Sequence, residues 1–315
     1  MSPDFQNLNS RLKTKDYRLF LAVLCLILAV TNAPSTAEGA QHEKPTVAVA
    51  NYPLKYFAER IGGDRIKVVF PIPLDVDPAF WVPEPEGVLT FQAADLILLN
   101  GATYSKWLNK VSLPRRKLVN TSQSFKDQYI EIKGSATHTH GPEGAHAHAG
   151  LAFTTWIDFQ QAIQQAEAIR DVLARLIPEQ KNDFEANFSA LKDDLLTLDR
   201  RAKEIVTNER AQPLITSHPV YDYFARRYGL NIKTVLWEPD EMPSNEQWVE
   251  LISILRNHPA RWMIWEGEPS PDSVDKLKSM EVESLVFDPC VNVPDQGDFL
   301  TVMKQNVKNL RSAFR

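Results

Sequence analysis

The chain has 315 residues, of which 43% are hydrophobic and 24% charged, so it can bury one large core or two medium ones and is globular rather than disordered. Its formal net charge of −5 gives no basis for nucleic-acid binding.

The N-terminus has the pattern of a secretory signal. Four basic residues between positions 11 and 18 precede an apolar run from Leu19 to Val30, and small polar residues follow. That run is shorter than the about 20 residues of a membrane-spanning helix, and this order of segments is typical of a cleaved leader. We therefore expect residues 1–37 to be a signal peptide and the mature protein to be periplasmic or secreted, with an uncleaved membrane anchor as the alternative. Cleavage would remove Cys25 and leave Cys290 without a disulfide partner.

Short β-branched runs alternate with amphipathic segments from Thr46 onward, which predicts parallel βαβ units. In the first half we expect strands at 46–50, 66–72, 95–99 and 117–120, with helices at 53–61 and 88–94. In the second half we expect strands at 214–216, 232–237, 262–265 and 284–287, with helices at 219–228, 245–257 and 299–312.

The strongest periodic signal lies between these halves. Seven apolar residues from Phe184 to Ile205 are spaced alternately four and three apart, which places all of them on one stripe of a helix. The sequence therefore predicts an α/β fold with two lobes of small parallel sheets flanked by helices. We expect an N-terminal lobe at 44–177, one long backbone helix at 178–206 and a C-terminal lobe at 207–315.

A histidine-rich segment interrupts the first lobe at 137–150. It has no large apolar residue to anchor a core, so we expect a mobile loop. Imidazole is the commonest protein metal ligand, and paired His-x-His spacings allow chelation at moderate affinity. The alternative is a solvated linker that is merely rich in histidine. The four histidines are His138, His140, His146 and His148.

Three predicted strands end beside residues of types that commonly bind metals. His218 follows the strand 214–216, Glu266 follows 262–265 and Asp288 follows 284–287. Because open α/β sheets bind ligands at the carboxyl ends of their strands, we expect these side chains to converge on a mixed nitrogen and oxygen site. The alternative for each is a helix-capping or packing role. The sequence has no Gly-rich phosphate loop, Gly-x-Ser-x-Gly elbow or His-Glu-x-x-His motif, so we expect no enzyme.

Over essentially all of residues 46–312 the chain resembles the metal-binding solute-binding proteins of ABC importers (cluster A-I, the ZnuA/TroA type). The resemblance rests on four stretches in this order, Val47–Leu54, Ala93–Gly101, Trp156–Asp158 and Ile215–Leu230. It implies two lobes joined by one long helix, a histidine-rich loop in the zinc branch, and delivery of the metal to a membrane permease.

The chain departs from the family at two metal-ligand positions. The family's first ligand histidine corresponds to Ala79 and its second to Thr154, so only His218 and Asp288 carry over. An alanine cannot ligate, and a neutral hydroxyl is a poor zinc ligand. Replacements could come from Asp77, Glu266, the Cys290 thiolate or the histidine-rich loop, although a buried Cys290 is more often plain packing. The changed stretch also brings Phe80 and Trp81 near the cleft, where they either pack between the lobes or stack on a larger ligand.

Together these features predict an extracytoplasmic protein that captures a transition-metal ion between its lobes for an ABC importer. We expect the ion to be zinc, with manganese as the second choice. The expected partners are the metal ion and an ABC permease, with no nucleic acid, and the protein is expected to be a monomer. The alternative function is a diverged receptor for a metal chelate or a small organic solute on the same scaffold.

Overall fold

The computed structural model describes residues 43–132, 137–140, 144–147, 150–207 and 211–314. The predicted signal peptide at 1–37 and the histidine at 148 lie outside the described residues. In the part that is described, no helix is both long and apolar enough to cross a membrane.

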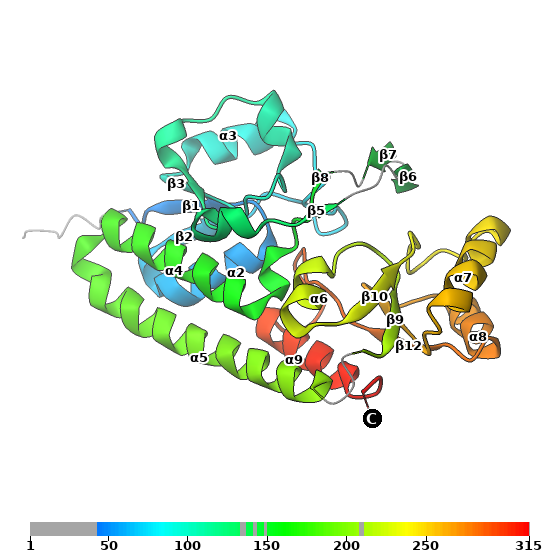
Figure 1. Cartoon of the computed structure of the whole chain (residues 1–315). Helices are drawn as coiled ribbons and strands as arrows, with labels where there is room; N and C mark the ends of the chain where they lie inside the picture. Colours follow the sequence, from blue (N-terminus) through cyan, green and yellow to red (C-terminus); the bar gives the residue numbers. More distant parts are fainter. Residues whose placement is uncertain (1–42, 133–136, 141–143, 148–149, 208–210, 315) are drawn as a thin grey trace, which may run out of the picture. The chain divides into compact units, whose positions relative to one another are not determined.

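The N-terminal lobe is built on a parallel four-stranded sheet with the order β2-β1-β3-β4 (Figure 1). Val47, Ala48 and Val49 of the inner strand β1 are fully buried, as expected for a parallel sheet covered on both faces. The strands are β1 (Thr46–Val49), β2 (Lys67–Val69), β3 (Leu96–Leu99) and β4 (Leu118–Asn120), and the helices are α2 (Tyr52–Gly62), α3 (Pro85–Ala93) and α4 (Phe159–Leu176).

The C-terminal lobe repeats this arrangement with the parallel order β10-β9-β11-β12, so each lobe places its first strand second in the sheet. Its strands are β9 (Pro213–Thr216), β10 (Asn231–Thr234), β11 (Trp262–Trp265) and β12 (Glu283–Val286), and its helices are α6 (Asp222–Tyr228), α7 (Asn245–Asn257), α8 (Pro271–Ser279) and α9 (Phe299–Leu310). These two sheets confirm the α/β fold class that the alternating pattern predicted.

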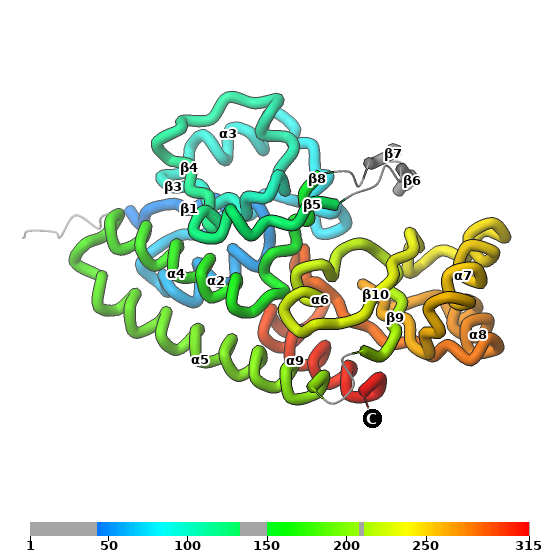
Figure 2. The backbone as a smooth tube through the Cα atoms, in the orientation of Figure 1, coloured from blue at the N-terminus to red at the C-terminus, as the bar shows by residue number. Residues whose placement is uncertain are grey.

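The long helix α5 (Lys181–Val206) follows a short 3-10 turn at Pro178–Gln180. Its 26 residues extend about 39 Å at 1.5 Å per residue. It contacts α2 and α4 of the N-terminal lobe and α6 and α9 of the C-terminal lobe, and Figure 2 shows α9 beside it. The stripe of apolar residues is buried as expected, except that Val206 rather than Ile205 is fully buried at the end.

Several local features differ from the sequence-based expectations. Helices α4 and α8 were not expected, and α6 begins at Asp222 because the residues after His218 form a turn first. The segment expected to be a mobile loop contains an antiparallel strand pair, β6 (Thr137–His140) with β7 (Gly144–Ala147). Two further short strands, β5 (Glu131–Ile132) and β8 (Gly150–Leu151), pair on either side of it.

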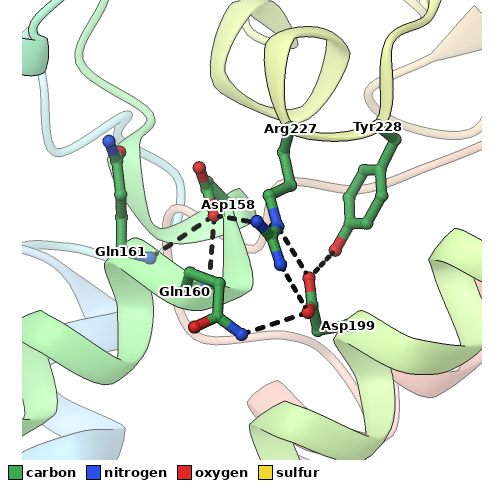
Figure 3. A network of polar contacts seen from close by, with 6 residues as sticks. All are labelled: Asp158, Gln160, Gln161, Asp199, Arg227 and Tyr228. Carbon is green, nitrogen blue, oxygen red and sulfur yellow. Dashed lines mark hydrogen bonds and ion pairs between the residues drawn. The ribbon is translucent and has the colours of Figure 1, made fainter.

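A polar network joins the start of α4 to α5 and α6 (Figure 3). Asp158 caps α4 by accepting hydrogen bonds from the backbone N–H groups of Gln160 and Gln161. Asp199 of α5 accepts hydrogen bonds from Arg227 and Tyr228 of α6 and from the Gln160 side chain. The network therefore fixes the long helix to one helix of each lobe.

Candidate metal site between the lobes

The site begins with Ser217, which holds together three loops at the carboxyl edge of the C-terminal sheet. Its N–H donates to Ile264 O at 2.9 Å, and its carbonyl accepts from Trp237 N at 2.9 Å. Its hydroxyl oxygen accepts from Glu266 N at 3.4 Å. Ser217 is fully buried, so these bonds are shielded from water. The loops after β9, β10 and β11 are thereby held side by side.

These three loops bring His218, Glu238 and Glu266 together. The Nδ1 atom of His218 lies 2.8 Å from Oε1 of Glu266 and 3.8 Å from Oε1 of Glu238. One ligand atom from each residue lies within 4.8 Å of the other two. His218 is 3% exposed, whereas both carboxylates are partly exposed. One imidazole nitrogen and two carboxylate oxygens at this spacing can share one divalent cation.

The electrostatics of this group favour a cation. Burial lowers the pKa of His218, but the neighbouring carboxylates of Glu266, Glu238 and Asp77 outweigh that effect and raise the pKa above its ordinary value. A positive charge at the imidazole is thus stabilised by the same carboxylates that would bind a metal ion.

The three side chains line a cavity of about 220 Å³ whose walls come from both lobes. Hydrogen bonds tie those walls together across the lobe boundary. Tyr223 donates its hydroxyl to Ala152 O at 2.9 Å, and the indole N–H of Trp156 donates to Pro289 O at 2.7 Å. The cavity therefore lies between the two lobes, which these hydrogen bonds join.

Two further predicted ligands, Asp77 and Asp288, line the same pocket but do not join the group of three. Asp77 accepts a hydrogen bond from Ala79 N at 2.8 Å, and Asp288 accepts one from Cys290 N at 2.6 Å. Burial raises the pKa of Asp288, and the nearby Glu266 carboxylate raises it further. Both carboxylates can contribute negative charge to the pocket without belonging to the cluster.

Cys290 is not brought into the group either. It is 2% exposed, packs within the main hydrophobic core and does not line the pocket. Burial raises the pKa of its thiol well above the usual value, and Asp288 raises it further. Its position fits the packing role that the sequence left open.

The substituted positions and their aromatic neighbours have separate roles. Ala79 is buried in the core, whereas Thr154 lines the pocket and donates its hydroxyl to Val220 O.

Of the two aromatic residues next to Ala79, Phe80 also lines the pocket. Trp81 does not, because its ring packs against Phe91 and Trp107 inside the N-terminal lobe. The expectation that Trp81 approaches the cleft is therefore corrected.

Sequence reasoning missed Glu238. It follows β10 by four residues, so the same strand-end rule that selected Glu266 would have selected it.

Of the four histidines at 137–150, His138 and His146 occupy paired positions of β6 and β7, and His140 ends β6. Their proposed metal binding stays a prediction.

The fold and the pocket define a two-lobed solute-binding protein. A family model described as zinc-uptake complex component A, periplasmic (ZnuA), matches residues 47–313. The chain belongs to this family, as its sequence predicted, and the family consists of solute-binding components rather than enzymes.

The relatives carry different metals in their names. The chain is 26% identical to the zinc-binding lipoprotein AdcA of Streptococcus pneumoniae, over 94% of this chain and 60% of AdcA. It is 26% identical to the manganese ABC transporter substrate-binding lipoprotein PsaA of the same species, over 93% of this chain and 95% of PsaA. The chain thus spans about 60% of the length of AdcA and nearly all of PsaA. The crystal structure of the metal-dependent lipoprotein YcdH from Bacillus subtilis has the same fold, with a TM-score of 0.74 and 22% identity, covering 86% of this chain and 100% of that one.

Proposed function

We propose that this protein captures a transition-metal ion, zinc in the first place, in the interlobe pocket and delivers it to the permease of an ABC importer. The observation that carries the proposal is the convergence of His218, Glu238 and Glu266 around a space that one cation can fill. Membership of the zinc-uptake family supports the transport role.

The ligand chemistry supports zinc and leaves manganese as the second candidate. Zinc binds imidazole nitrogen and carboxylate oxygen in four-coordinate sites. Two of the three donors are oxygens, which also suits manganese, the metal named for PsaA. The protein would do no chemistry on the ion, and bound metal would stabilise the folded chain by mass action.

The proposed location is outside the cytoplasm, where such components collect their ions. Relatives named as lipoproteins support this placement. We further propose that residues 1–37 act as the leader and that the protein works as a monomer without nucleic acid, in keeping with the net charge of −5. Mass spectrometry of the protein from its natural envelope would establish where the mature chain begins.

Zinc titration in competition with a chromophoric chelator tests the site. We expect tight binding of one zinc ion, and we expect His218→Ala and Glu266→Gln each to weaken it about tenfold or more, which corresponds to about 1.4 kcal/mol. Glu268→Gln is the matched control, because Glu268 lies two residues beyond Glu266 but does not line the pocket. Equal zinc affinities in the unchanged chain and all three variants would refute the site while leaving the fold intact.

A further inference from the structure

The cluster of three residues leaves a zinc ion with an incomplete set of protein ligands. Zinc takes four donors in its usual sites, and within the described residues the group supplies one nitrogen and two oxygens. Ala79 has no donor atom, and the hydroxyl of Thr154 donates to Val220 O. The group of three therefore leaves at least one coordination position to another donor in the pocket.

The pocket is much larger than that one position requires. Its volume is about 220 Å³, whereas a cavity of about 15 Å³ is enough for a single water molecule. A bare ion with one bound water would leave most of this space without a specific contact. The space instead suits an organic molecule of several non-hydrogen atoms bound beside the ion.

Part of the pocket wall is apolar and aromatic. Phe80 and Phe153 pack edge to face with ring centroids 6.4 Å apart, and both rings line the pocket together with Ile132 and Val220. Pockets for small molecules combine such apolar walls with a few placed polar groups. A hydrated ion gains nothing from this wall, whereas the carbon skeleton of a chelator does.

The charge of the pocket selects the kind of chelator. Four carboxylates line it, those of Asp77, Glu238, Glu266 and Asp288, and its described lining contains no Lys or Arg. Lys106 lies over the Phe80 ring at 5.1 Å but is not part of the lining. A further anion would add negative charge beside these acidic side chains, so a neutral or cationic molecule suits the pocket better.

We infer that the pocket binds the metal ion together with a small chelator that carries amine or imidazole nitrogens. The chelator completes the coordination of the ion with its nitrogens and places its carbon skeleton against Phe80 and Phe153. This inference rests on the proposed metal capture and specifies the form in which the metal is bound.

Equilibrium dialysis of the full chain tests it, with zinc and radiolabelled L-histidine as the probe. We expect about one histidine per zinc-loaded protein, none without zinc, and no retention of radiolabelled citrate. Zinc retained without histidine would overturn the inference and leave the proposed function intact. Retention of citrate in place of histidine would also overturn it, because the charge argument would be wrong. No zinc retained under any condition would overturn both.

A pocket variant shows where the histidine binds. Thr154→His supplies an imidazole from the wall of the pocket, so it should lower co-bound histidine about fivefold or more and tighten the binding of zinc alone about tenfold. Thr207→His is the matched control, since Thr207 is exposed beyond the end of α5. Unchanged histidine retention in Thr154→His would place the probe outside the pocket and refute the inference. Thermal unfolding checks that both variants fold. If Thr154→His does not fold, the dialysis of the unchanged chain with zinc, histidine and citrate alone tests the inference.

Discussion

Arg227 of α6 binds Asp199 of the long helix through two nitrogens. Its Nε lies 2.9 Å from Oδ1 and its Nη2 lies 2.6 Å from Oδ2, so the planar guanidinium engages both carboxylate oxygens (Figure 3). The same Nε lies 3.8 Å from the Asp158 carboxylate at the start of α4. One arginine of the C-terminal lobe is thus connected both to the long helix and to the N-terminal lobe.

Removing this arginine should destabilise the fold. The Asp199 side chain is only 11% exposed, so Arg227→Ala would leave a largely buried carboxylate without its charged partner. We expect the free energy of unfolding to fall by about 1.5 to 3 kcal/mol, the usual range for hydrogen bonds to charged groups. Urea denaturation followed by circular dichroism measures this change.

Arg201→Ala is the control for that measurement, because Arg201 is an exposed arginine on α5. It should change the free energy of unfolding by no more than about 0.5 kcal/mol. A double-mutant cycle of Arg227→Ala with Asp199→Asn should give a favourable coupling energy of at least about 1 kcal/mol. Additive effects of the two substitutions would show that the pair contributes no stability.

Asp199 should also make the stability of the protein depend on acid pH. Burial raises the pKa of Asp199, but hydrogen bonds from Arg227, Tyr228 and Gln160 outweigh that effect, so the pKa lies below its ordinary value of 3.8. A carboxyl group with a lowered folded-state pKa contributes stability above its unfolded-state pKa and loses it as the pH falls through the folded-state value. The free-energy difference between the unchanged chain and Asp199→Asn should therefore be constant at neutral pH and shrink below about pH 4. Urea denaturation of both proteins across this range measures it, and a difference that grows in acid would contradict the assignment.

The sequence predicted most of the fold because hydrophobic periodicity reports burial directly. The strands β1, β3, β9 and β11 are short apolar runs, and the apolar stripe of α5 identified the backbone helix. Helix α4 was missed although Phe159, Ala162, Ile163 and Ala166 have helical spacing and are buried. Its small alanines and frequent glutamines made that stripe less conspicuous than the one on α5.

The site was harder to predict because it depends on contacts between distant segments. His218 and Glu266 could be selected, since His218 lies two residues after β9 and Glu266 directly follows β11. Glu238 follows β10 by four residues and fits the same rule, but its position beside His218 depends on the bond from Trp237 N to Ser217 O. The strand-end rule names candidate ligands, and the hydrogen bonds between loops determine which of them meet.

The structure predicts a different ranking of ligands from that implied by the family resemblance. Glu238 belongs to the group around His218, whereas Asp288 lines the pocket outside it. Glu238→Gln should therefore weaken zinc binding about tenfold, and Asp288→Asn by less than about threefold. Competition titrations of the two amide variants make the comparison. A larger loss for Asp288→Asn than for Glu238→Gln would contradict this ranking and place Asp288 among the zinc ligands.

Cys290 should be dispensable for metal binding. Its side chain is buried in the core and its pKa is raised by burial, both of which oppose the thiolate form that binds zinc. Cys290→Ala should therefore keep the zinc affinity within about twofold, although it should lower the free energy of unfolding by about 1 kcal/mol through lost packing. In a Cys25→Ser chain, where Cys290 is the remaining cysteine, alkylation by iodoacetamide should be slow in the folded protein and equally slow with and without zinc. Protection that appears only when zinc is added would show that the thiol coordinates the ion, and the ligand group would then include sulfur.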